Sequence, residues 1–333
     1  MKNLKFLFLI VPFLFSSCEK DIIEGPSLND LYGELTVLES LVVINDSADF
    51  SVGEDIYFTA SFSKQVDWKI MIMGLSSGSI KVISGKSNAI NRSNSLWDGS
   101  STLLPFFTAE DCSVQLTFEM HDDTINRQLN INVEKEYNDE NTVLITDFEN
   151  GFNPNFTGFF QSGCTQALTN GNSGEGTRHL QQFGTCDWDW LIGYIDYKAS
   201  FWFNDNNLIS DPSKVYFNIM INGDSTISQI AGIPNSLFKL EFYEDENGDG
   251  EYDPSTEDRY DYEFDVNWNG WKMISFRYDD ADKLVLATNG GDGLRNPSNI
   301  NNVRTLLLAN PESGFARADV DFLIWSIGGS ILY

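Results

Sequence analysis

One segment of the sequence carries side-chain oxygens at alternate positions. It runs from Asp245 to Asp258, with oxygen ligands at its positions 1, 3 and 5, a glycine at 6 and a carboxylate at 9. Calcium takes six to eight hard oxygen ligands, and alternate side chains in a tight turn point inward together. The segment therefore predicts a structural calcium ion, with the ligands Asp245, Asn247, Asp249, Glu251, Asp253 and Asp258.

The spacing resembles the first part of an EF-hand calcium loop and departs from it at position 12. Thr256 stands where that loop has a bidentate glutamate, so Glu257 or Asp258 has to replace it. Ten acids and a single base between Asp245 and Asp265 would repel one another without a cation. A solvated acidic hairpin without an ion is the alternative.

Three of the same acids also resemble the Glu-x-Asp-x-x-Glu signature of retaining β-glucan hydrolases. In that signature, alternation along a strand places nucleophile and acid on one face, about 5 Å apart. Between Asp253 and Glu257 the spacing is one residue longer, and Pro254 interrupts any strand. We therefore predict that the chain is not an enzyme, with catalysis at Glu251, Asp253 and Glu257 as the alternative.

Aromatic side chains are the candidates for binding a sugar, because the C–H face of a pyranose packs on an aromatic ring. Trp188 and Trp190 share one face of a predicted strand, since strand side chains alternate. Trp268 lies at a strand end beside an Asn-Gly turn signal, and Arg178 and Gln181 could bind sugar hydroxyls. The alternative is that these indoles fill the core of the fold.

The N-terminus has the features of a bacterial lipoprotein signal. A short basic region precedes an apolar run at 6–15, which is too short to cross a bilayer. Residues 14–18 resemble the lipobox, in which small residues precede a cysteine. The resemblance implies a signal peptide at 1–17, a lipid on Cys18 and a tether at 18–33. An ordinary secretory signal with an incidental cysteine is the alternative.

The next residues and the other cysteines agree with export. Residues 19–21 resemble the signal that sends Gram-negative lipoproteins to the cell surface, which implies an outer-membrane location. Because that compartment is oxidising, Cys164 and Cys186, 22 residues apart, are a predicted disulfide. Closing a loop of that size stabilises by roughly 3 kcal/mol in the chain-entropy model. Cys112 shares its predicted strand face with Val114 and is expected to be a buried free thiol.

The composition sets the size and class of the chain. Its 333 residues are 41% hydrophobic, enough for two cores of ordinary size. Lys and Arg total 21 against 49 Asp and Glu, and the net charge of -28 disfavours nucleic acid as a partner, because phosphates require cations. The chain has only two histidines, which disfavours a histidine-based zinc site.

Short alternating runs with turn signals between them predict β-strands throughout, and no long helical period is present. The first domain is predicted over residues 34–137 as an immunoglobulin-like sandwich. Its expected strands are 36–44, 55–63, 67–74, 79–85, 112–120 and 126–135. Residues 96–99 and 106–107, followed by the expected strand 112–120, resemble the closing hairpin of bacterial Ig-like modules. A polar stretch at 136–141 predicts the boundary to a larger domain over 138–333.

Three segments of the second domain carry a family resemblance. They are an opening Asp-Phe-Glu at 147–149, a Trp-Lys-Met-Ile-Ser-Phe at 271–276 and a terminal Val-Asp-Phe at 320–322. In this order they resemble galactose-binding-type jelly rolls, the architecture of many carbohydrate-binding modules. The resemblance implies a non-catalytic β-sandwich that binds a polysaccharide. With the lipobox and the Ig-like spacer, the chain is similar to surface glycan-binding lipoproteins of polysaccharide-uptake systems.

Together these resemblances imply an all-β lipoprotein of the outer membrane that captures a neutral polysaccharide beside an import complex. A β-glucan is the preferred ligand class. A glycoside hydrolase or lyase on the same sandwich is the first alternative, and a protein-binding adhesin or assembly subunit is the second.

Replacing Trp188 and Trp190 together by alanine is expected to lower glycan affinity, because the change removes both rings on which a sugar would stack. Affinity electrophoresis through gels that contain neutral polysaccharides measures the loss. Undiminished retardation of the double variant would contradict the assignment of the site to these two indoles.

Overall fold

The computed structural model describes residues 33–137, 140–185, 190–202, 210–225, 229–230, 233–309 and 315–332. Over these residues the chain is built almost wholly from β-strands, as the sequence predicts. One short α-helix, α2 (Arg92–Ser95), and four 3-10 turns (Phe50–Val52, Ala199–Phe201, Pro212–Lys214 and Pro297–Asn299) complete the described part. No helix there has the length and apolar character that a membrane span requires.

The first unit is a six-stranded sheet folded over its own core. Its strands are β1 (Val37–Ile44), β2 (Ser47–Asp49), β3 (Tyr57–Gly74), β4 (Ile80–Ile90), β5 (Asp111–Phe118) and β6 (His121–Val133). They follow the order β1-β3-β5-β6-β2, and β4 also pairs with β3. Leu41, Phe58, Ile70 and Leu116 lie in the core that this folding encloses.

Two details of the first unit differ from the sequence prediction. β3 is one strand of 18 residues where two were expected, because residues 63–66 contain no glycine or proline to end it. Its first part pairs with β1 and its last part with β5. The first part of the expected closing hairpin, residues 96–107, forms two isolated bridges, Ile56 with Trp97 and Ile80 with Leu103, whereas its last part is the strand β5. The Trp97 ring packs in the core between Phe50 and Phe107.

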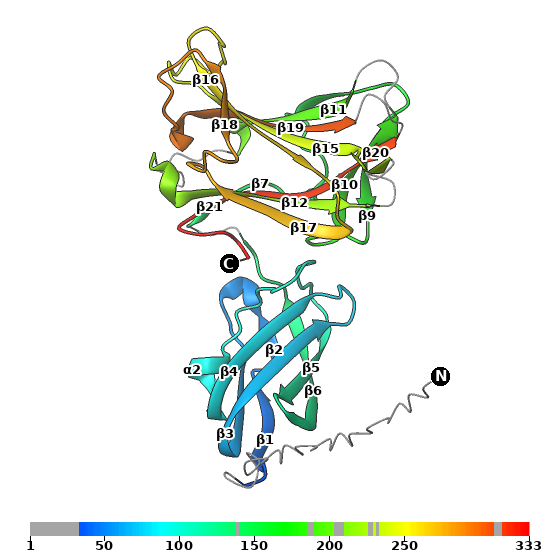
Figure 1. Cartoon of the computed structure of the whole chain (residues 1–333), viewed down its shortest axis with the longest axis vertical. Helices are drawn as coiled ribbons and strands as arrows, with labels where there is room; N and C mark the ends of the chain where they lie inside the picture. The colour runs from blue at the N-terminus through cyan, green and yellow to red at the C-terminus, as the bar shows by residue number, and fades with distance from the viewer. Residues whose placement is uncertain are drawn as a thin grey trace, which may run out of the picture.

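The second unit is a sandwich of two sheets (Figure 1). We call the sheet nearer the first unit the proximal sheet, with the order β17-β12-β21-β10-β20, where β7 also pairs with β21 and β9 with β10. Its strands are β7 (Thr142–Thr146), β9 (Thr165–Asn170), β10 (Arg178–Thr185), β12 (Val215–Gly223), β17 (Gly270–Arg277), β20 (Phe315–Arg317) and β21 (Asp319–Ile327).

The other sheet, which we call the distal sheet, has the order β18-β16-β15-β19-β11-β8. Its strands are β8 (Thr157–Phe160), β11 (Leu191–Lys198), β15 (Ser236–Glu244), β16 (Asp258–Asp265), β18 (Val285–Asn289) and β19 (Ile300–Ala309). A two-stranded ribbon, β13 (Gln229–Ile230) with β14 (Ile233–Pro234), stands apart from both sheets.

The core of the sandwich comes from alternate residues of facing strands. Phe217 on β12 and Phe242 on β15 meet with ring centroids 5.1 Å apart, and both contact the fully buried Trp325 on β21. Aromatic side chains bury 150–250 Å² each, so such contacts between the two sheets contribute much of the stability. Trp325 therefore lies at the centre of the core that the two sheets enclose.

The two units meet on the outward side of the proximal sheet. Phe106 of the first unit stacks on Tyr137 with a centroid distance of 4.5 Å and meets the ring of Phe322 on β21 edge-on at 5.5 Å. The backbone N–H of Phe106 donates to the carbonyl of Gly174 at 2.8 Å. Met220 and Ile324 extend this apolar cluster. One outward side of the sandwich is therefore covered, whereas the distal sheet lies on the far side from the first unit (Figure 1).

Replacing Phe106 by alanine is expected to lower the free energy of unfolding by about 3 kcal/mol, because it removes a buried ring from the cluster that joins the units. Urea unfolding followed by tryptophan fluorescence measures the change. Leu103→Ala, at a side chain 55% exposed in the same segment, is the control and should shift stability by less than about 0.5 kcal/mol. Equal midpoints for the two variants would contradict a stabilising role for the cluster.

Candidate functional site

The outward side of the distal sheet carries polar and aromatic side chains in place of the apolar ones that face the core. We call this surface the polar face. It consists of Phe159 on β8, Tyr194, Asp196 and Lys198 on β11, Asn302 and Arg304 on β19, Lys239, Glu241 and Tyr243 on β15, and Arg259 and Asp261 on β16. Because side chains alternate along a strand, burying one set in the core points the other set outward.

Strand register brings four charged residues of the polar face into one row. Asp196 lies opposite Arg304, Arg304 opposite Glu241, and Glu241 opposite Asp261. Directly opposite residues in an antiparallel pair have Cβ atoms about 5 Å apart, close enough for ion pairs. The row therefore crosses four strands that are distant in sequence.

The charges in this row are paired. Arg304 binds Asp196 through two parallel hydrogen bonds, Nε to Oδ1 at 2.7 Å and Nη2 to Oδ2 at 3.0 Å. Lys239 Nζ lies 2.9 Å from Glu241 Oε1 and 2.7 Å from Asp261 Oδ2. Arg259 Nε donates to Asp261 Oδ1 at 2.8 Å. Three acids and three bases of the polar face thus neutralise one another, and Lys198 is its fourth base.

Two tyrosines flank the Arg304 guanidinium. Its carbon lies 4.2 Å from the ring centroid of Tyr194 and 5.4 Å from that of Tyr243. Burial alone would lower the pKa of Arg304, but the hydrogen bonds to Asp196 and the nearby charges of Asp196 and Glu241 together raise it. Arg304 is therefore a fixed planar cation that holds two aromatic rings in place.

Glu241 is held as a carboxylate. Its side chain is only 6% exposed, and burial alone would raise its pKa. Hydrogen bonds from the Tyr243 hydroxyl and Lys239 outweigh that effect and lower the pKa. A carboxylate of this kind can accept hydrogen bonds but has no proton to donate near neutral pH.

A cavity of about 320 Å³ lies where the polar face meets the loop between β15 and β16. Its lining consists of Asp196, Lys198, Tyr243, Glu251, Tyr252, Asn301, Asn302 and Arg304. The rings of Tyr243 and Tyr252 meet edge-on at 4.9 Å and form its aromatic corner. Asn302 donates to Asp196 at 2.6 Å, and its Oδ1 accepts no hydrogen bond from the described part of the chain.

An apolar strip continues from the charged row to the edge of the sheet. Phe159 on the edge strand β8 lies opposite Tyr194, with ring centroids 6.2 Å apart. Phe159 is 38% exposed. The polar face therefore offers an accessible aromatic ring beside planar charged groups.

The structure does not gather the sugar-binding residues predicted from the sequence on one surface. Trp190 is 41% exposed and directly precedes β11 of the distal sheet, whereas Trp188 lies outside the described residues. Trp268 precedes β17 of the proximal sheet, where Phe264 stacks near it and Lys272 Nζ lies 4.7 Å from its ring centroid. Arg178 and Gln181 lie on β10 of the proximal sheet. The Arg178 side chain donates to Asn170 Oδ1 at 3.0 Å.

The cysteines are placed in part. Cys112 is a buried free thiol, as predicted, and burial raises its pKa to about 12. Cys164 Sγ lies 3.5 Å from the carbonyl oxygen of Thr185, and a Cβ on Gly184 would lie 2.3 Å from that sulfur. Cys18 and Cys186 lie outside the described residues, so the lipid and the disulfide stay predictions.

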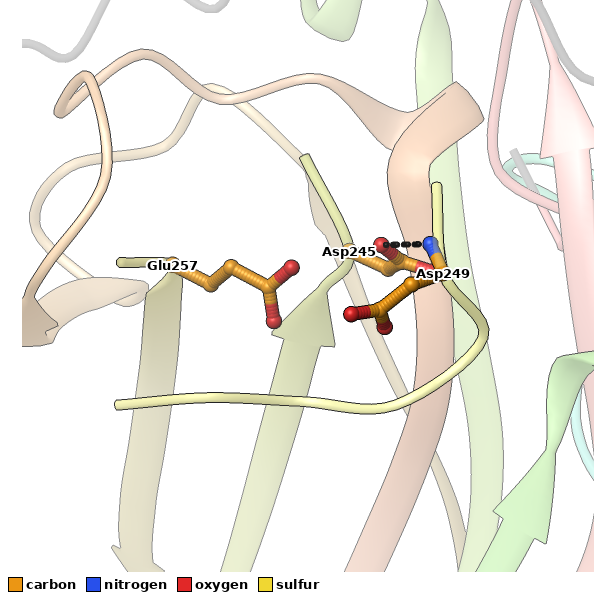
Figure 2. Close-up of side chains that lie close together, drawn as sticks. All are labelled: Asp245, Asp249 and Glu257. Carbon is orange, nitrogen blue, oxygen red and sulfur yellow. Dashed lines mark hydrogen bonds between the residues drawn. The ribbon is translucent and has the colours of Figure 1, made fainter. Parts of the chain in front are cut away.

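The acidic segment forms the loop that joins the antiparallel pair β15 and β16. Asp245, Asp249 and Glu257 each place a carboxylate oxygen within 4.8 Å of the other two (Figure 2). Asp245 Oδ1 accepts from the Gly248 N–H at 2.6 Å and Oδ2 from the Gly250 N–H at 2.7 Å. Both glycines have a positive φ, which explains why glycine occupies these positions.

The other predicted metal ligands are placed elsewhere. Asn247 Oδ1 accepts from the Asp249 N–H and Asp253 Oδ1 from the Ser255 N–H, each within the loop. Asp258 belongs to a second acidic group with Glu246 and Asp292. The structure thus puts Glu257 in the position that the sequence assigned to Asp258, because Asp258 already accepts from the N–H groups of a glycine loop, Gly291 and Gly293. Glu251 lines the cavity of the polar face.

The polar face was not predicted from the sequence, although part of its signal is present there. Lys239, Glu241 and Tyr243 alternate with Phe238, Leu240 and Phe242 along β15, the pattern of a strand with one buried side. The alternation of apolar and polar residues is less regular along β11 and β19. Which strands lie side by side depends on pairing between distant segments, and the local pattern does not contain that information.

Comparisons with known proteins add little to this picture. No family model and no curated protein matches the chain. The chain is similar to the solution structure of the carbohydrate-binding module CtCBM11, with 16% identity, coverage of 57% of this chain and 96% of that chain, and a TM-score of 0.35. A likeness this distant assigns neither fold nor function, so the site has to be judged on its own geometry.

Replacing Glu241 by glutamine is expected to lower the free energy of unfolding by about 1–3 kcal/mol at about pH 7, since the charged hydrogen bonds from Lys239 and Tyr243 are weakened. Because the folded-state pKa of Glu241 is below its ordinary 4.5, the stabilisation is present above that pH and is lost as pH falls through the folded-state pKa. Urea unfolding at several pH values should therefore show the two proteins converging in acid. Glu263→Gln, at an exposed acid of β16, is the control. A difference that stays constant from neutral pH into acid would contradict this role.

Proposed function

We propose that the protein is a non-catalytic surface lipoprotein that binds a neutral polysaccharide on the polar face. The observation that carries the proposal is the combination, on one open sheet face, of fixed planar hydrogen-bonding groups with accessible aromatic rings. Sugars present hydroxyl groups and C–H faces. The planar polar groups can hydrogen-bond the hydroxyls, and the aromatic rings can pack on the C–H faces.

The charge balance of the polar face favours a neutral ligand. Arg304, Lys239 and Arg259 are each paired with an acid of the same face, so none supplies an uncompensated positive charge. The chain as a whole carries -28. The negative charge of the chain would repel an anionic polysaccharide, whereas a neutral polysaccharide meets no such repulsion. A β-glucan is the first ligand to test.

Binding without hydrolysis is supported by the state of the carboxylates. A glycosidase needs one carboxyl group with a raised pKa as general acid. On the polar face, Glu241 has a lowered pKa and Asp196 is clamped by Arg304. The Glu-x-Asp-x-x-Glu-like acids lie in a loop. Burial raises the pKa of Glu257 there, but its side chain is fully buried beside Asp245 and Asp249 and does not face a sugar.

The placement of the polar face agrees with a surface anchor. β1 begins at the end of the first unit that lies farther from the sandwich (Figure 1). A lipid on Cys18 would hold that end at the outer membrane, and the first unit would act as a spacer. The polar face would then be directed away from the membrane, where it could hold a polysaccharide near an import complex.

Affinity electrophoresis of the purified protein through gels with neutral and acidic polysaccharides tests the proposal. Retardation is expected in a neutral glycan only. Phe159→Ala and Tyr252→Ala should each weaken binding on the order of tenfold, because each removes an aromatic contact. Phe315→Ala is the matched control: its ring is 37% exposed against 38% for Phe159, but it lies on β20 of the proximal sheet.

Three outcomes would contradict the proposal, each in its own way. Equal weakening by Phe315→Ala would move the site away from the polar face. Release of reducing ends from the retained glycan would favour the glycoside hydrolase. No retardation in any gel, together with capture of a defined protein partner, would favour the adhesin or assembly subunit.

A further inference from the structure

The loop between β15 and β16 holds three carboxylates at the spacing of ligands around one ion. Asp245 and Asp249 come from the start of the loop and Glu257 from its end, and their oxygens lie within 4.8 Å of one another. Calcium–oxygen distances are 2.3–2.6 Å, so two ligands on opposite sides of one ion lie about 5 Å apart. Figure 2 shows the Asp249 and Glu257 carboxylates turned toward one another, while the Asp245 carboxylate beside them accepts from the Asp249 N–H at 3.2 Å.

A second observation separates this group from an ordinary acidic surface. Glu257 is fully buried, with 0% of its surface exposed. Its Oε2 accepts from the Asp253 N–H at 2.7 Å, but its Oε1 has no hydrogen-bond partner among the described residues. A buried carboxylate oxygen without a partner is energetically unfavourable, and a cation between the three carboxylates would remove that penalty.

We propose that Asp245, Asp249 and Glu257 bind a calcium ion, and that this ion fixes the loop that supplies Glu251 and Tyr252 to the cavity of the polar face. The second half of the proposal rests on the proposed function. The first half stands without it.

The connection to the cavity is short. Glu251 and Tyr252 lie between Asp249 and Glu257 in sequence, so the ion would tie together both ends of the segment that carries them. Tyr252 packs edge-on against Tyr243 of the polar face at 4.9 Å. Fixing the loop in advance lowers the ordering cost of ligand binding, which is the physical basis of the expected coupling.

Three carboxylates, with loop carbonyls and water for the remaining positions, suit calcium better than magnesium. Calcium accepts irregular sites with six to eight oxygens, whereas magnesium demands an octahedron with bonds of 2.0–2.1 Å. An irregular loop whose carboxylate oxygens lie up to 4.8 Å apart fits the larger ion.

Isothermal titration calorimetry of the purified protein with CaCl₂, without glycan, tests the ion site. One calcium ion is expected to bind, with MgCl₂ giving weaker binding or none. Asp249→Asn and Glu257→Gln should each lower calcium affinity on the order of tenfold or more, because each removes a ligand charge. Two variants are used because Asp249 is exposed and its replacement spares the fold, whereas Glu257 is buried.

Asp253→Asn is the matched control. Asp249 and Asp253 are both exposed, and each accepts from the N–H two residues further along the loop, of Glu251 and Ser255. Only Asp249 belongs to the group with Asp245 and Glu257, so Asp253→Asn should keep wild-type calcium affinity. Absence of binding at about 1 mM calcium would overturn the ion site. Equal losses in Asp249→Asn and Asp253→Asn, or no loss in Asp249→Asn and Glu257→Gln, would overturn it too.

The coupling is tested by measuring glycan affinity in calcium and after chelation with EDTA. We expect weaker binding after chelation, and the same weakening in calcium for Glu257→Gln. Calcium binding with identical glycan affinity in both conditions would overturn the coupling and leave the ion site intact. Calcium binding with no glycan binding in either condition would overturn the proposed function instead.

Discussion

Each strand of the distal sheet has to bury one side against the core of the sandwich, and the polar face is a consequence of that constraint. Phe238, Leu240 and Phe242 fill the core from β15, so Lys239, Glu241 and Tyr243 have to point outward. Antiparallel register then brings Glu241 beside Arg304 and Asp261. The same packing that stabilises the fold thus assembles the charged row.

Arg304 orients both the charged and the aromatic side chains of the polar face. Its two hydrogen bonds to Asp196 neutralise both charges, and its contacts with Tyr194 and Tyr243 fix the rings. A surface built in this way loses little conformational entropy when a ligand binds, because its polar groups are already oriented. Most of its charges are also paired, which supports the proposal of a neutral ligand.

The two outward sides of the sandwich differ in the polarity of their side chains and in their contact with the first unit. The side of the proximal sheet carries Met220, Phe322 and Ile324, apolar residues that Phe106 and Tyr137 cover. The side of the distal sheet is polar and stays away from the first unit (Figure 1). The contact between the units therefore decides which face of the sandwich is available to a ligand.

Local patterns in the sequence were sufficient for the all-β architecture, the buried Cys112 and the acidic loop between β15 and β16, because alternation and turn residues act over a few neighbouring positions. They were not sufficient for the choice of Glu257 over Asp258, which depends on a glycine loop more than 30 residues away that occupies Asp258. Nor did they reveal the row of Asp196, Arg304, Glu241 and Asp261, whose members lie on four strands joined in space by long-range pairing. Contacts between distant segments have no signature in a local window, since their free energy arises only when the sheets have formed.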